Sequence, residues 1–150
     1  MLDKHFDLRD RTKQFALRVL KLCDSLPKTE AARIISRQLL RSGTSVAANY
    51  RAAGRVRSRA EFVAKVGVVV EEADESVFWL ELLVESGMIA KPRLDDLVAE
   101  ANELVSIFVA SRKPRKEDER AAVGGFLFTR SPDHPISRLS NLGGINLWLT

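Results

Sequence analysis

Residues that start and stop helices divide the first 112 residues of this chain into four segments, and this division limits the fold more than any other feature. Leu26-Pro27 ends the first segment, because the residue before proline leaves helical geometry and proline lacks the N–H that a helix needs. The run Ser58–Glu61 has the form of a capping box that opens the third segment. Gly87 and then Pro92 separate the third segment from the fourth. Each segment therefore predicts one helix.

Apolar residues recur at helical spacing within each of the four segments. Only 7% of the residues are aromatic, and Ala, Leu, Val, Glu and Arg are abundant, which favours helices over sheets. Short connections make consecutive helices antiparallel neighbours. We therefore expect an all-α fold, an antiparallel up-down four-helix bundle over residues 1–112. The expected helices run from Leu8 to Cys23 with Asp7 as N-cap, from Thr29 to about Val56, from Ser58 to Gly87, and from Leu94 to Ser111.

The second helix is interrupted near its middle by Gly43, Thr44 and Ser45. Glycine costs a helix about 1 kcal/mol relative to alanine, and hydroxyl side chains compete for backbone hydrogen bonds. Either the helix breaks there or another element packs closely against it. The neighbouring small residues favour a continuous or kinked helix. Its expected core residues are Ala31, Ile34, Ile35, Gln38, Leu39, Val46 and Tyr50.

Residues 113–150 differ in character from the helical segments. A run of mixed charges extends from Arg112 to Arg120, and the sequence from Gly124 onward has two Gly-Gly pairs, two prolines and apolar residues without a period. We expect a charged linker and a mobile, irregular C-terminal tail. The alternative is that its apolar ends dock on a partner.

The charge and cysteine content narrow the setting in which the chain works. The formal net charge is +4, which helps association with phosphate polymers but also occurs in proteins that bind none. Cys23 is the single cysteine and cannot form an intramolecular disulfide. We find no leader sequence and no apolar run of about 18 residues. These features predict a soluble cytoplasmic protein without membrane contact.

A basic ridge follows the second helix, because three arginines recur at intervals of four residues. Guanidinium groups along one side of a helix can neutralise backbone phosphates of RNA or DNA. A solvated helix face, or ion pairs from these arginines to the acidic third helix of another subunit, explains the same pattern equally well. The ridge comprises Arg33, Arg37 and Arg41, and it continues through Arg51, Arg55, Arg57 and Arg59 around the turn into the third helix.

Polar residues also share one face of the second helix and one face of the third. We expect the two faces to meet in a hydrogen-bonded polar seam that fixes the register of the helices, with Arg41 available to a carboxylate. The expected seam comprises Ser42, Ser45 and Asn49 from the second helix, and Glu72, Glu75 and Ser76 from the third, beside Trp79.

The sequence lacks the residues that catalysis or metal binding in a helical bundle would need. The only histidines, His5 and His134, lie near the chain ends, so no Glu-x-x-His pair for a di-iron site exists. No base is placed to activate a nucleophile. We therefore expect no metal, no cofactor and no enzymatic activity.

Phe78 and Trp79 adjoin a leucine-rich turn of the third helix. Buried aromatic side chains contribute large contact areas. Because the neighbouring residues are apolar and acidic, stacking on a nucleic-acid base is disfavoured. We expect at least one of the two in the core or in a subunit interface.

Three ordered blocks of sequence resemble a known bacterial family. The blocks are residues 38–51 (QLLRSGTSVAANYR), 58–62 (SRAEF) and 72–83 (EADESVFWLELL). They resemble the four-helix-bundle proteins associated with intervening sequences in 23S ribosomal RNA genes, over about residues 6–112. The chain departs from that pattern at Ala52 and Gly54, where relatives commonly carry Glu and a larger polar residue.

The resemblance implies a small antiparallel bundle that assembles into a homopentamer. The family is also similar to the accessory variability determinant protein of diversity-generating retroelements, which binds nucleic acid and a reverse transcriptase. The implied function is a non-enzymatic homo-oligomer that binds RNA or DNA through a basic surface, as an accessory to a reverse transcriptase or to a ribosomal RNA intervening sequence. The alternative is a structural or protein–protein interaction bundle with no nucleic-acid role.

Overall fold

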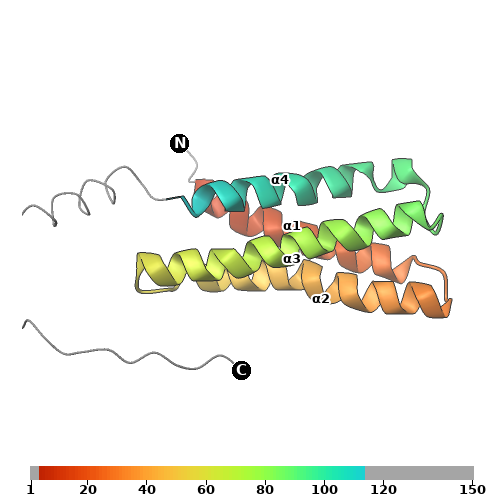
Figure 1. Ribbon diagram of the computed structural model, residues 1–150, viewed down its shortest axis with the longest axis horizontal. Helices are drawn as coiled ribbons and strands as arrows, with labels where there is room; N and C mark the ends of the chain where they lie inside the picture. The colour runs from red at the N-terminus through yellow and green to blue at the C-terminus, as the bar shows by residue number, and fades with distance from the viewer. Residues whose placement is uncertain (1–3, 114–150) are drawn as a thin grey trace, which may run out of the picture. The chain divides into compact units, whose positions relative to one another are not determined.

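The computed structural model describes residues 4–113, with side chains from Leu8 onward, and these residues form a bundle of four helices (Figure 1). Consecutive helices pack against each other, and α1 also contacts α4. The described residues contain no strand, so the predicted all-α bundle is confirmed. Residues 114–150 of the predicted tail lie outside the described residues. The helices are α1 (Lys4–Asp24), α2 (Glu30–Ala53), α3 (Arg59–Glu85) and α4 (Asp95–Ser111), with a 3₁₀ turn, η1 (Lys91–Arg93), before α4.

Side chains cap the starts of α2 and α3 as predicted. The Thr29 hydroxyl accepts a hydrogen bond from the Ala32 N–H at 3.2 Å, and the Ser58 hydroxyl accepts one from the Glu61 N–H at 3.1 Å. The Glu61 carboxylate accepts from the Arg57 N–H at 3.1 Å, one residue before the position that a capping box uses. Both caps satisfy backbone donors that would otherwise have no partner in the first turn.

Several helix boundaries differ from the prediction, most of all the start of α1 and the end of α2. α1 begins at Lys4, so Asp7 lies within it and is not its N-cap, because no helix-breaking residue precedes Asp7. α2 ends at Ala53 instead of Val56, since a hydrogen bond from the Arg55 N–H to the Ala52 carbonyl tightens the chain into the turn. α4 follows a 3₁₀ turn and starts after residue 94.

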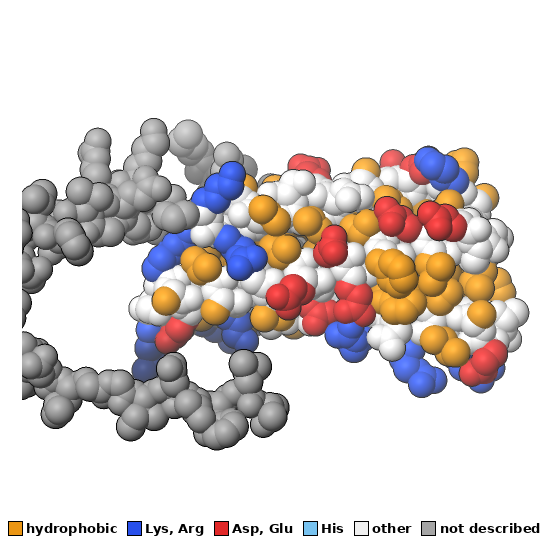
Figure 2. All heavy atoms as spheres, viewed as in Figure 1, with side chains coloured by type: hydrophobic (Ala, Val, Ile, Leu, Met, Phe, Trp, Pro, Cys, Tyr) orange, Lys and Arg blue, Asp and Glu red, His pale blue; other side chains and the backbone are white. Residues whose placement is uncertain are grey.

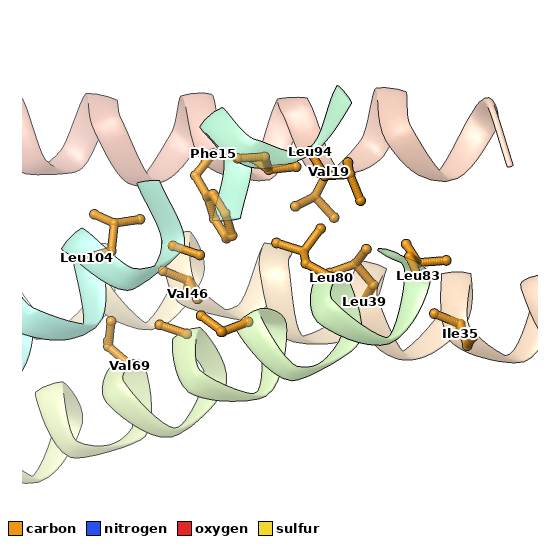
Figure 3. Close-up of a cluster of buried hydrophobic side chains, with 14 of the residues drawn as sticks. Phe15, Val19, Ile35, Leu39, Val46, Val69, Leu80, Leu83, Leu94 and Leu104 are labelled. Atoms are coloured by element: carbon orange, nitrogen blue, oxygen red, sulfur yellow. The ribbon is translucent and has the colours of Figure 1, made fainter. Parts of the chain in front are cut away.

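All four helices contribute to one apolar core (Figure 3). Burying a large apolar side chain contributes roughly 1.5–3 kcal/mol. Two of the predicted core residues of α2 are exposed: Ala31 and Ile34 lie outward, and Ala32 and Ile35 are buried instead. The largest fully buried side chains include Phe15 and Val19 of α1, Leu39 and Val46 of α2, Leu80 and Leu83 of α3, and Leu104 and Phe108 of α4.

α2 runs without a break through Gly43. A Cβ atom added at Gly43 would lie 3.0 Å from both Cγ atoms of Val19, so the glycine lets α1 and α2 approach closely. The predicted continuous helix is therefore confirmed, and its cause is the close packing that the small residues suggested.

A bidentate ion pair joins the first helix to the last. Arg11 donates from Nε and Nη2 to the Glu100 carboxylate at 3.1 and 2.9 Å, and its Nη2 also lies 3.0 Å from Glu103. The hydrogen bond to Glu100 raises the pKa of Arg11 above its usual value. The Arg11 charge therefore connects α1 to α4 and is not available to an external ligand.

Candidate nucleic-acid interface

Basic side chains from three helices, from the turn between α2 and α3 and from the residues after α4 converge at one end of the bundle. The up-down topology places the starts of α1 and α3 and the ends of α2 and α4 at this end (Figure 1), where Figure 2 shows Lys and Arg gathered. The acidic residues of these segments are Asp7, Asp10 and Glu61, and Glu103 lies beside Arg11. The exposed basic residues, which we call the basic end, are Arg9, Lys13, Arg51, Arg55, Arg57, Lys65, Arg112 and Lys113.

The three ridge arginines of α2 are all exposed but differ in their partners. Arg33 forms an exposed ion pair with Glu30 of its own helix at 2.9 Å, and Arg37 is exposed. Arg41 reaches α3 instead.

Two carboxylates of α3 hold Arg41. Its Nη1 lies 3.2 Å from Glu72 Oε2, and its Nη2 donates to both carboxylate oxygens of Glu75. Trp79 Nε1 donates to Glu75 Oε1 at 3.0 Å. The hydrogen bond from Arg41, followed by that from Trp79, lowers the pKa of Glu75. The positive charge of Arg41 is thereby balanced within the bundle.

The predicted polar seam is assembled in part. Ser76 Oγ donates to Ser42 Oγ at 2.9 Å, and both side chains are fully buried between α2 and α3. Asn49 instead donates to the hydroxyl and carbonyl oxygens of Ser45 on its own helix, at 2.9 and 3.0 Å. The structure thus brings Arg41 and Ser42 to α3 but keeps the hydrogen bonds of Ser45 and Asn49 within α2. That the seam fixes helix register stays a prediction.

The guanidinium group of Arg59 binds carbonyl groups at the C-terminal end of α4. Its Nη2 donates to the carbonyl oxygens of Ser111 and Lys113 at 3.0 and 2.9 Å, and its guanidinium lies 5.2 Å from the centre of the Phe62 ring. The last carbonyls of a helix lack partners in the helix, and a cation there is favourable. Arg59, predicted to contact nucleic acid, therefore has an internal role in the bundle.

A groove lies between α1 and α2 at the basic end. Small residues of α2 and charged residues of α1 line it, and its volume is ≈ 590 Å³. Among the described residues, no carboxylate forms an ion pair with the side chains of Arg9, Lys13 or Arg51. The groove, which we call the α1–α2 groove, is lined by Arg9, Asp10, Lys13, Thr44, Ala47, Ala48 and Arg51.

Sequence reasoning missed Arg9 and Lys13, although a signal for them was present. The predicted antiparallel order of the helices already placed the start of the first helix beside the end of the second. Both residues then fall next to Arg51, which was predicted as a nucleic-acid contact.

The two aromatic residues of α3 lie in different surroundings. Trp79 is half-buried and packs against the core, whereas Phe78 is 53% exposed, and their ring centres are 4.8 Å apart. Over the middle of α3, Figure 2 shows acidic and hydrophobic side chains in place of basic ones. This face therefore differs in chemistry from the basic end.

Within residues 8–113, where side chains are described, no three His, Cys, Asp or Glu residues lie together closely enough to hold a metal ion. In the same part of the chain, no helix has the length and apolar content needed to cross a membrane. The basic end and the α1–α2 groove are therefore the features that the candidate site rests on.

Comparison with known proteins finds a matching family model and similar solved structures. The family model described as 23S rRNA-intervening sequence protein matches residues 4–110. A crystal structure from Bacteroides thetaiotaomicron, described as a protein with unknown function from the S23 ribosomal protein family, is 32% identical. The similarity covers 71% of this chain and 99% of that chain, with a TM-score of 0.67. No curated protein matches this sequence.

Proposed function

Because the chain belongs to the 23S rRNA-intervening sequence protein family, we propose that it is a non-enzymatic protein that binds nucleic acid through the basic end of its bundle. The observation that carries the proposal is the convergence at that end of exposed Arg and Lys side chains from α1, α2, α3, the turn between α2 and α3, and the two residues after α4. Fewer acidic residues belong to the same part of the bundle, namely Asp7, Asp10, Glu61 and Glu103. Such a concentration of one charge attracts a polyanion.

Contacts between these cations and backbone phosphates would release counterions from the nucleic acid. The affinity should then fall linearly with salt on logarithmic axes, with a slope set by the number of phosphates neutralised. Arg33 and Arg41 contribute less, since each already pairs with a carboxylate.

The experiment is a titration of labelled RNA with the full chain over a series of salt concentrations. Replacing both Arg55 and Arg57 by Gln should weaken binding and lower the salt slope by roughly 1 for each phosphate that is no longer neutralised. Arg93→Gln, an exposed change in η1, is the matched control and should leave binding unchanged. Binding that does not depend on salt, or that is equal in all variants, would overturn the proposal.

The proposal includes assembly of identical subunits, with the pentamer as the expected number. Phe78 supports this part, because a phenylalanine that is half-exposed beside a tryptophan is typical of interface aromatics. A mass measurement in solution tests it: the wild type should be oligomeric, and Phe78→Asp should lower the mass. A monomeric wild type would contradict the assembly.

A structural or protein–protein interaction role is the second candidate. The α3 face favours it, since exposed apolar and acidic side chains there suit a protein surface better than a phosphate backbone. A reverse transcriptase is a candidate partner under this second role, as an expected similarity to the accessory variability determinant protein would imply. Partner capture that is lost in Phe78→Asp but kept in the Arg55→Gln, Arg57→Gln double variant, together with no salt-dependent RNA binding, would favour this second role.

A further inference from the structure

We propose that the α1–α2 groove binds the backbone of single-stranded nucleic acid, and that the surrounding basic residues contact double strands and single strands alike. This inference rests on the proposed function and assigns the strand selectivity to a particular site. It follows from the charge, the small side chains and the volume of the groove.

Three cationic side chains stand on the two walls of the groove. Arg9 and Lys13 are one turn apart on α1, about 6 Å along the helix, and Arg51 comes from α2. This spacing is comparable with that of successive phosphates along a strand. None of the three is in an ion pair with another described residue, so no internal ion pair must break when a phosphate binds.

The α2 side of the groove is formed by small residues. Ala47 is half-buried and Ala48 is exposed, so a ligand can come close to the helix and place a sugar or base against the two methyl groups. The guanidinium planes of Arg9 and Arg51 can stack on an unpaired base. Asp10 also lines the groove, and its carboxylate is available to accept a hydrogen bond from a ribose hydroxyl or a base amino group.

The size of the groove selects a strand over a duplex. A volume of ≈ 590 Å³ lies within the range of pockets that hold small ligands, roughly 300–1,000 Å³. The axes of packed helices are about 8–10 Å apart, so a furrow between two helices is narrower than a double helix. A duplex can reach the rim but cannot enter, whereas an extended strand can lie along the floor.

The decisive variant fills the groove without changing its charge. Ala48→Leu adds apolar volume at an exposed position of α2, where leucine is a strong helix former, so the bundle should still fold. With the full chain, affinity for a labelled oligouridine should fall about tenfold, which is about 1.4 kcal/mol. Affinity for a duplex of equal length should stay within about twofold by the same scale. Ala99→Leu, at an exposed position of α4, is the matched control and should change neither affinity.

A charge variant gives an independent reading. Lys13→Gln with Arg51→Gln should weaken oligouridine binding and reduce its salt slope by roughly 1 for each phosphate that these side chains neutralise. Arg18→Gln, an exposed change on α1 outside the groove, should not. If Ala48→Leu leaves oligouridine binding intact, or weakens duplex binding equally, the groove proposal is wrong. Loss of binding in the Arg55→Gln, Arg57→Gln variant would then still support the basic end, whereas salt-independent binding in every variant would refute both.

Discussion

The two sides of α2 meet their neighbours in different ways. Toward α3, Arg41 is balanced by carboxylates and a serine pair is buried. Toward α1, Gly43 packs against Val19, and the contact between these two helices continues into the α1–α2 groove. There Arg51 has no ion pair among the described residues. The arginine charge of α2 is therefore neutralised by carboxylates of α3 on one side, and it is accessible to an external ligand on the other. The spacing of the arginines along the sequence does not distinguish these two uses.

The largest effect on stability should come from a larger side chain at the contact of α2 with α1. Gly43→Leu puts a side chain where even a Cβ would be 3.0 Å from Val19, and overpacking of this kind costs about 1–3 kcal/mol. Chemical denaturation should show a lower unfolding midpoint. Gly54→Ala is the control, because the α2 cap has room for a Cβ, with the nearest atom at 3.6 Å. A Gly43→Leu variant as stable as the wild type would mean that the contact between α1 and α2 is not close-packed.

A smaller effect is expected from the buried serines on the α3 side. Ser76→Ala leaves the Ser42 hydroxyl without its inter-helix partner, at a cost of about 1–2 kcal/mol. Replacing both serines by alanine should cost less than the sum of the single changes, because no unpaired hydroxyl remains. A double-mutant cycle measures this coupling, and strict additivity would show that the pair contributes nothing as a pair.

The smallest effect concerns the exposed ion pairs of Arg41. The pKa of Glu75 is lowered in the folded state, so its pairing stabilises the fold above the unfolded pKa near 4.5 and loses this contribution as the pH falls through the folded pKa. Thermal melts from about pH 3 to about pH 7 should therefore show a shallower acid decline for Glu75→Gln than for the wild type. Glu71→Gln, on the same helix and in no ion pair within the described residues, should keep the wild-type decline.

The fold was largely predictable because its signals are local. Thr29 and Ser58 cap their helices through contacts within one turn, and Gly87 adopts a φ of 73° one residue after the C-cap of α3. The two core positions of α2 that were predicted wrongly, Ala31 and Ile34, were also inferred from a local pattern. A contiguous pair such as Ile34 and Ile35 fits two neighbouring stripes, and only packing against the other helices decides which of them is buried.

The candidate site was less predictable because it depends on where long side chains reach. Arg41 and Arg59 lie in the predicted basic series, but each finds internal partners from residues far along the chain, Glu75 and Ser111 among them. Arg9 could have been found, since helix order alone brings it to the basic end. The pairing of Arg41 with a carboxylate was predicted as part of the polar seam, whereas the contact of Arg59 with the end of α4 was not, because sequence spacing sets the direction of a Cα–Cβ bond and not the contact at the end of the side chain.

Because α2 continues without a break through Gly43, local unfolding of this helix should be coupled to the opening of the whole bundle. Residues 43–45 form helix poorly by themselves, so their helical state depends on the helices packed on either side. In isolation, residues 30–53 should fray from the centre as well as from the ends. In the bundle, amide hydrogens near Gly43 should exchange with solvent only when α1 and α3 both separate from α2, and their exchange rate therefore reports opening of the whole structure.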